Sequence, residues 1–108
     1  LLKIETINAD AVGEDTKNVN GEWLEINNFG KKPVQLLGYI LKDESNNQFI
    51  FPNLLLNTNS HLKVFSGIGI NSTQNLYWGN NSPIWNNDSD SAYLFDKDFK
   101  LIDFSWYP

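Results

Sequence analysis

The chain has 108 residues and a net charge of −5, and it contains no cysteine, no methionine and a single histidine. This length suits one domain with a radius of gyration of about 13 Å, and the missing cysteine excludes disulfide scaffolds, thiolate metal sites and cysteine nucleophiles. The acidic balance argues against binding to phosphate backbones, and no apolar run approaches the roughly 20 residues that cross a bilayer. Because the chain begins at Leu1 without an initiator methionine, we expect residues 1–108 to be one domain cut from a longer protein.

Short apolar runs separated by polar turns predict strands along the whole chain. The expected strands are 2–8, 21–28, 34–41, 48–51, 62–65, 76–78, 92–95 and 100–106. In the first run Ile4 and Ile7 are three positions apart, so a bulge near Thr6 is expected to bring both to one face. The run 34–41 is apolar on both parities, which is typical of a strand covered on two sides.

Seven or more short strands without a helical pattern predict an all-β fold, an immunoglobulin-like antiparallel β-sandwich. Without a disulfide, such a sandwich is held together by apolar packing. The expected core consists of Ile4, Leu24, Ile26, Leu36, Ile40, Phe49, Phe51, Val64, Leu94, Ile102 and Phe104.

Residues with catalytic chemistry are sparse and poorly placed. His61 stands alone beside an expected strand, where an exposed turn histidine is the simpler interpretation than a general base. Glu22 and Glu25 are three positions apart in a strand and face opposite sides, so they do not form the carboxylate pair of a glycosidase. We therefore expect no enzyme, no catalytic residue and no cofactor.

The turn around Asp88 and Asp90 has one metal alternative, because calcium takes six to eight oxygen ligands without a fixed motif. The segment 86–90 lacks the glycine and the distant glutamate of an EF-hand loop. The competing interpretation is a turn held by its own side chains, since Asn and Asp bond backbone N–H groups two residues further on.

The same segment also has the chemistry of a sugar-binding site. Sugar rings stack on flat aromatic faces beside amide and carboxylate groups. The candidate ligand-binding residues are Trp78, Trp85, Asn86, Asn87, Asp88 and Asp90. In the competing interpretation the tryptophans close one end of the sandwich, and Trp85→Ala then costs about 3 kcal/mol or more.

Ordered blocks over nearly the whole chain resemble the lamin tail domain family. The blocks are NGEWLEINN at 20–28, Gly30, VQLLGYILKD at 34–43, FIFP at 49–52, Gly67 and Gly69, LYW at 76–78, IWNN at 84–87 and DSAYLFD at 90–96. Two departures concern glycines: this chain has Ser89 and Phe99 where family members usually have Gly. Because positive φ is awkward for Phe, the final hairpin is expected to turn one residue earlier, at Lys97 and Asp98, or to form a longer loop.

The resemblance implies an immunoglobulin-like sandwich with no catalytic residues. In animals the family forms the globular tail of nuclear lamins, and in bacteria and archaea it is appended to larger, often secreted proteins. This sequence is similar to the prokaryotic kind, because it has no basic flank, no coiled coil and no lipidation motif.

We therefore expect a non-catalytic adhesion, targeting or interaction module of a secreted or surface-displayed multidomain protein. Its partner would be a protein or an envelope or matrix polymer outside the cell. The alternative is a carbohydrate-binding module that uses the Trp and Asn loop residues. A nucleic-acid-associated module of a nuclease is the third interpretation, and the negative charge disfavours it.

Overall fold

The computed structural model describes residues 2–9, 21–80, 84–85 and 90–107, and these residues form an all-β fold. The strands are β1 (Leu2–Asn8), β2 (Trp23–Asn28), β3 (Val34–Gln35), β4 (Ile40–Lys42), β5 (Gln48–Ile50), β6 (Leu55–Leu56), β7 (His61–Phe65), β8 (Asn75–Tyr77), β9 (Asp90–Phe95) and β10 (Leu101–Tyr107). The radius of gyration is 13.0 Å, the value expected for this length.

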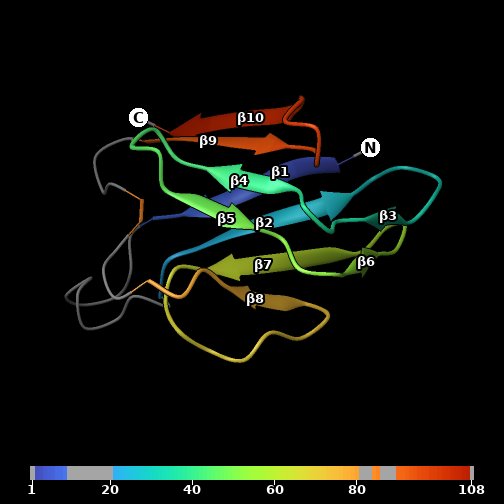
Figure 1. Cartoon of the computed structure of the whole chain (residues 1–108), viewed down its shortest axis with the longest axis horizontal. Coiled ribbons are helices and arrows are strands. Elements are labelled where there is room, and N and C mark those ends of the chain that lie inside the picture. The colour runs from blue at the N-terminus through green and yellow to red at the C-terminus, as the bar shows by residue number, and fades with distance from the viewer. Residues whose placement is uncertain (1, 10–20, 81–83, 86–89, 108) are drawn as a thin grey trace.

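Two four-stranded sheets make up the sandwich (Figure 1), one in the order β1-β2-β7-β8 and the other in the order β10-β9-β4-β5. A short two-stranded ribbon, β3-β6, lies at one end of the molecule. The described strand pairs are antiparallel apart from β7 and β8, which run parallel from Lys63 opposite Asn75 to Phe65 opposite Tyr77. The β-sandwich prediction is thus confirmed, with one parallel pair that the sequence pattern did not indicate.

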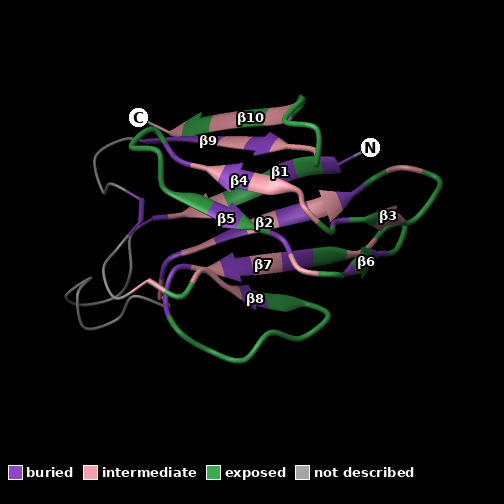
Figure 2. Cartoon of the chain, viewed as in Figure 1, coloured by how far each residue is buried: buried purple, intermediate pink, exposed green. Residues whose placement is uncertain are grey.

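The core lies between the sheets because alternate side chains of each strand point to one face. On β2, Leu24 and Ile26 are fully buried, and on β9 Ala92 and Leu94 are fully buried. Figure 2 shows this buried layer along the strands of both sheets. At about 1.5–3 kcal/mol for each large apolar side chain, this packing replaces the disulfide of antibody domains.

The predicted bulge in the first strand is confirmed. The register of β1 against β2 shifts between Ile4 and Thr6, so that Ile4 pairs with Ile26 and Ile7 pairs with Leu24. One extra residue changes which face the following side chains occupy. Ile4 is therefore buried, and Ile7 packs against the core as a half-buried residue.

The single strand predicted over 34–41 is wrong, because the chain turns in the middle of it. Gly38 has φ +83°, and the N–H of Tyr39 donates to the carbonyl of Leu36 at 2.9 Å. This turn separates β3 from β4, which belong to different sheets. The run is apolar on both parities because Leu36 and Leu41 enter the core from opposite sides of the turn, while Leu37 is exposed.

The β9–β10 hairpin turns around Lys97 and Asp98, but the expectation that this turn would spare Phe99 a positive φ is wrong. The N–H of Phe99 donates to the carbonyl of Asp96 at 3.0 Å, and the N–H of Asp96 donates to the carbonyl of Lys100 at 2.9 Å. Phe99 nevertheless takes the left-handed conformation, with φ +61°. Its ring stacks on that of Phe95, with the centroids 4.3 Å apart, which offsets part of the backbone strain.

Three residues of the expected core, Ile40, Ile102 and Phe104, are not buried. Phe104 is 45% exposed and Ile40 is half-buried, because both point away from the other sheet. The cause for Phe104 is a second bulge, since the register of β10 against β9 shifts between Leu101 and Asp103. Ile102 still packs against the core, but Phe104 and Trp106 are turned to the outer face.

Candidate functional site

The end of the sandwich where β2 begins and β9 begins is organised by a buried carboxylate. Glu22 has no exposed surface, and its Oε1 accepts hydrogen bonds from Ser66 Oγ at 2.8 Å, Ile84 N at 2.9 Å and Trp85 N at 3.2 Å. A buried carboxylate is tolerated where several donors satisfy it. Glu22 therefore ties the segment before β9 to the first sheet.

The tryptophans of the predicted sugar site pack against each other at this end. Trp85 is 2% exposed, and the rings of Trp78 and Trp85 meet edge to face with their centroids 5.8 Å apart. Trp78 also contacts the ring of Phe49 at 5.8 Å. Because Trp85 presents no ring face to solvent, it has the closing role of the competing interpretation.

Of the other residues in that predicted site, the structure describes only Asp90. Asn86, Asn87 and Asp88 lie outside the described residues, as does Ser89. Asp90 is 2% exposed, and its Oδ1 accepts from the N–H of Ser91 at 2.8 Å and of Glu44 at 3.3 Å. Ligand binding by this loop, sugar or calcium, stays a prediction. Within the described ranges no three His, Cys, Asp or Glu side chains are grouped so as to hold a metal ion.

Tyr107 lies beside the same buried acidic groups. Burial raises the pKa of the Tyr107 hydroxyl well above its usual value near 10, and the carboxylates of Asp90, Glu22, Glu44 and Asp43 raise it further. Asp43 is itself fully buried, where it accepts hydrogen bonds from Ser45 N and Asn47 N. These groups hold the β4–β5 turn and the start of β9 together.

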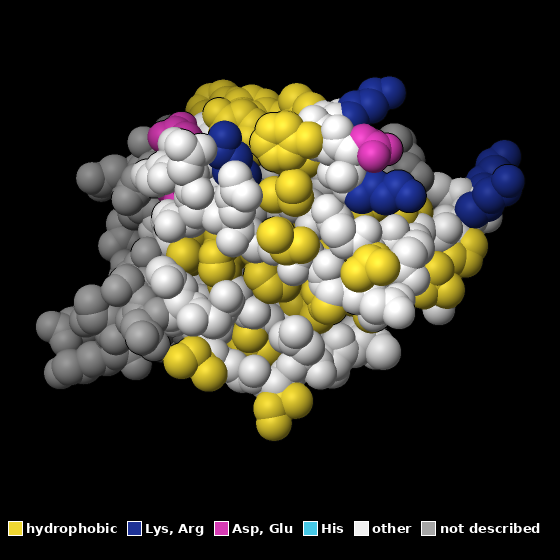
Figure 3. Space-filling model, viewed as in Figure 1, with side chains coloured by type: hydrophobic (Ala, Val, Ile, Leu, Met, Phe, Trp, Pro, Cys, Tyr) yellow, Lys and Arg dark blue, Asp and Glu magenta, His cyan; other side chains and the backbone are white. Residues whose placement is uncertain are grey.

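A different surface carries most of the exposed aromatic side chains. The register places one row of side chains on the outer face of the β10-β9-β4-β5 sheet, away from the core. We call this set the outer face; it consists of Ile40, Ile50, Tyr93, Phe95, Phe99, Leu101, Phe104 and Trp106. Figure 3 shows hydrophobic side chains gathered over β9 and β10 and continuing across β4 and β5.

The outer face is apolar and extensively exposed. Ile50 is 64% exposed, Trp106 62%, Phe99 53%, Leu101 51% and Phe104 45%. Five side chains that are each about half exposed leave on the order of 500 Å² of apolar surface, the upper range for the largest patch on a soluble monomer. Such a patch is typical of a binding surface rather than of scattered surface residues.

Its rings pack on one another along and across the strands. The centroids of Tyr93 and Phe104 are 5.1 Å apart, and those of Tyr93 and Phe95 are 6.4 Å apart. Phe95 and Phe99 stack nearly parallel, at 10°. Stacking therefore covers one face of each of these two rings, and part of the aromatic surface is used in contacts within the chain.

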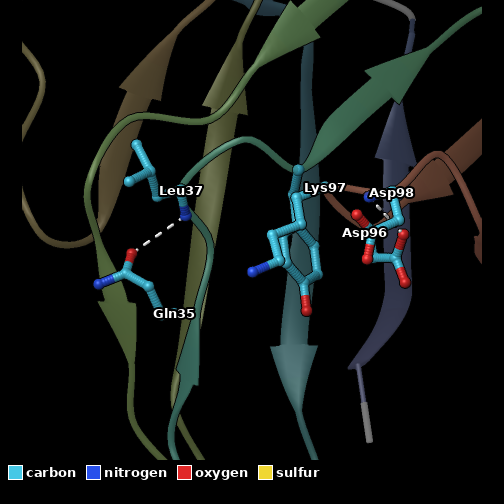
Figure 4. A pocket seen from close by; sticks show the side chains of 6 residues that line it. Gln35, Leu37, Asp96, Lys97 and Asp98 are labelled. Carbon is cyan, nitrogen blue, oxygen red and sulfur yellow. Dashed lines mark hydrogen bonds between the residues drawn. The ribbon is translucent and has the colours of Figure 1, made fainter.

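A hollow of about 300 Å³ adjoins the outer face at the β9–β10 turn. In Figure 4, Gln35 and Leu37 lie on one side of it, and Asp96, Lys97 and Asp98 lie on the other; Tyr39 also lines it. Burial raises the pKa of the Tyr39 hydroxyl, and the Asp96 carboxylate adds to the effect.

Two of the polar side chains that line the hollow, Gln35 and Asp96, accept hydrogen bonds from the backbone. Gln35 Oε1 accepts from the N–H of Leu37 and of Leu54, each at 3.0 Å. Asp96 Oδ1 accepts from the N–H of Asp98 and of Lys100, each at 2.9 Å.

The comparison with known families agrees with this architecture. The family model described as Lamin Tail Domain matches residues 2–108. The chain belongs to the lamin tail domain family. No individual curated protein matches the sequence. Lamin tail domains are immunoglobulin-like and non-enzymatic, which is consistent with a non-catalytic interaction module.

Two side chains of β7 contact side chains of β2 in this lamin tail domain. His61 is exposed at the start of β7, with Nε2 3.9 Å from a carboxylate oxygen of Glu25. Lys63 lies over the ring of Trp23, with Nζ 4.1 Å from the ring centroid. In the part of the chain that the structure describes, no helix has the length and apolarity needed to cross a membrane.

Sequence reasoning missed the outer face and the buried polar residues of this lamin tail domain. Phe104 and Trp106 alternate as strand residues do, but the bulge that turns them outward has no clear sequence signal. Asn28 is fully buried and donates to the carbonyls of Lys32 and Leu56 at 2.9 and 3.0 Å. Glu22 lies in the NGEW block at 20–23, which carried the family resemblance but did not indicate that its carboxylate is buried.

Proposed function

We propose that this lamin tail domain is a non-catalytic interaction module that binds a protein or an envelope or matrix polymer through its outer face. The proposed setting is a larger secreted or surface-displayed protein, where the domain attaches its parent to that partner. The observation that carries the proposal is the exposed apolar row over β10, β9, β4 and β5, which lies in the upper range of the largest apolar patches on soluble monomers.

The charges around the outer face are of both signs. Lys42 lies opposite Tyr93 in the register, and Lys97 and Lys100 alternate with Asp96 and Asp98 along the turn that contains Phe99. A lysine has a long apolar stem, so these lysines extend the apolar surface while placing a charge at its rim. Rim charges of this kind set orientation and association rate more than affinity.

Co-sedimentation of a fluorescently labelled domain with isolated envelopes of the producing cells tests the proposal. Ile50→Lys places a charge on the outer face, and Ile70→Lys is the matched control because Ile70 is 91% exposed and lies outside this face. We expect Ile50→Lys to weaken envelope binding about tenfold or more, equivalent to about 1.4 kcal/mol, and Ile70→Lys to leave it unchanged. Protease-treated envelopes and purified peptidoglycan distinguish a protein partner from a polymer.

The proposal fails if Ile50→Lys binds envelopes as well as the unaltered domain does. It also fails if Ile70→Lys weakens binding to the same extent, because the effect would then come from the added charge and not from the outer face. Circular dichroism of both variants shows whether the fold is retained.

A carbohydrate ligand is the second candidate, and the hollow beside Tyr39 favours it. A phenol, an ammonium and carboxylates around about 300 Å³ offer donors and acceptors for sugar hydroxyls. Titration calorimetry with oligosaccharides, compared for the unaltered domain and for Asp98→Asn, tests this candidate. Loss of sugar binding in Asp98→Asn supports it, and absence of binding by the unaltered domain rejects it.

A further inference from the structure

The edge strand β10 is seven residues long and pairs with β9 on one side. Among the described residues no strand pairs with its other side, and Figure 1 shows it along the rim of the sheet. Proteins usually protect such an edge with lysine, proline or a short strand, because unpaired backbone groups recruit other strands. A bulge or an inward-pointing charge also protects an edge, and β10 has both: the bulge between Leu101 and Asp103, and the inward-pointing carboxylate of Asp103. Both lie in the first half of the strand, so residues 104–107 contain no bulge, charge, lysine or proline.

The hairpin geometry shows which backbone groups of β10 face outward. The N–H of Asp96 donates to the carbonyl of Lys100, so Asp96 is at a hydrogen-bonded position. Along an antiparallel pair, hydrogen-bonded and non-hydrogen-bonded positions alternate. Tyr93 and Ser91 are an odd number of residues before Asp96 in the chain, so they lie at non-hydrogen-bonded positions of β9. Their partners in the register are Phe104 and Trp106. The N–H and C=O of Phe104 and Trp106 therefore point away from β9, to the outer edge.

These two residues form a self-complementary edge. We propose that a second copy of this chain pairs with β10 in the antiparallel direction, with Ser105 opposite Ser105 of the second copy. Phe104 of each copy then lies opposite Trp106 of the other, and the N–H and C=O groups of both residues exchange hydrogen bonds. The two sheets become one continuous sheet, and the two outer faces become one surface.

The side chains of β10 suit this pairing. Phe104 and Trp106, which are 45% and 62% exposed, become cross-strand aromatic neighbours on the outer face. Asp103 of each copy lies opposite Tyr107 of the other, so no carboxylates are opposed. The carboxylate of Asp103 is already held by Ile4 N at 2.8 Å and lies 3.9 Å from Lys3 Nζ.

Pairing is independent of which partner the outer face binds, but it would double that surface and strengthen binding to a repetitive polymer. One strand from each copy makes a small interface, so we expect association to depend on concentration. Because each chain carries a net charge of −5, added salt is expected to favour the dimer.

The absence of cysteine permits a direct test by oxidative cross-linking. In the proposed register Ser105 and its counterpart occupy a non-hydrogen-bonded pair, whose Cα atoms are about 4.5 Å apart, within the range of a disulfide. Ser105→Cys is expected to form a covalent dimer on oxidation. Ile50→Cys, on the opposite edge of the same sheet, is expected to stay monomeric. A monomeric Ser105→Cys, or equal cross-linking of Ile50→Cys, overturns the proposal.

Sedimentation equilibrium provides the second measurement and needs no cysteine. The unaltered chain of 12.4 kDa is expected to approach twice that mass as concentration rises. The double variant Phe104→Lys with Trp106→Lys brings like charges opposite each other and is expected to remain monomeric, while Ile50→Lys still dimerises. A chain that stays monomeric up to millimolar concentration overturns the pairing. Loss of envelope binding in Ile50→Lys is a separate result that concerns the outer face alone.

Discussion

The backbone N–H of Trp85 lies 3.2 Å from the carboxylate oxygen Oε1 of Glu22, although the two residues are 63 positions apart. The same oxygen accepts from Ile84 N and Ser66 Oγ, so one buried charge holds three segments of chain. The bond places the Trp85 ring over the end of the core, against Trp78. Trp85 and Trp78 therefore close this end of the sandwich by packing against the core.

Glu22→Ala is expected to lower the free energy of unfolding by about 3 kcal/mol, because buried donors lose a charged acceptor. Urea denaturation of the variant and of the unaltered chain measures the difference. Glu5→Ala is the matched control, since Glu5 is exposed on β1 and should change stability by about 0.5 kcal/mol or less. Equal stability of the two variants would show that the Glu22 contacts contribute nothing.

Trp85→Ala is expected to cost about 3–5 kcal/mol, since it leaves a large cavity beside Trp78. The control is Trp106→Ala, because Trp106 is 62% exposed and its removal opens no cavity. Thermal unfolding followed by circular dichroism compares the two. An unchanged melting temperature for Trp85→Ala would place its ring on the surface and return it to the candidate sugar site.

Phe99 combines a strained backbone with a favourable ring contact, and two variants separate these effects. Phe99→Gly removes both the strain and the stacking on Phe95, so its stability is expected to change by less than about 1 kcal/mol. Phe99→Ala removes the stacking but keeps the strain, and should be about 1 kcal/mol less stable than Phe99→Gly. If chemical denaturation ranks the alanine variant above the glycine variant, Phe99 is not in the left-handed conformation.

Tyr107 predicts how stability depends on alkaline pH. Burial first, and then the nearby carboxylates, raise the pKa of Tyr107 in the folded state above its unfolded value near 10. Its contribution is therefore complete below pH 10 and is lost as pH rises from there through the folded pKa. Tyr107→Phe should flatten the fall in unfolding free energy above pH 10. Tyr93→Phe, which removes a hydroxyl from the outer face, serves as the control; identical slopes for all three proteins would refute this.

The net charge of −5 leads to a prediction about nucleic acid. All eight basic residues are lysines, and no described strand carries a row of them. Fluorescence anisotropy with short DNA is expected to show no binding at moderate salt. Binding at moderate salt that weakens steeply as salt rises would support the nuclease-associated interpretation instead.

The positions of most strands could be predicted because they depend on local pattern. Alternation located β2 and β9, and the three-residue spacing of Ile4 and Ile7 revealed the bulge in β1. The prediction of a single strand over 34–41 was wrong because a turn between two buried leucines has the same apolar pattern as a strand covered on both faces. The short strand β6 was missed, since two residues contain too little pattern to detect.

The sequence by itself determined the fold class, the family, the absence of thiol chemistry and the apolar cohesion of the sandwich, because composition and strand periodicity are local properties. Only the tertiary structure decided which aromatic residues are covered. Trp85 is buried because Glu22, distant in the chain, anchors its backbone. Phe104 and Trp106 are exposed because one bulge shifts the parity of β10. Burial depends on strand register and on long-range contacts, and neither can be deduced from the spacing of neighbouring residues.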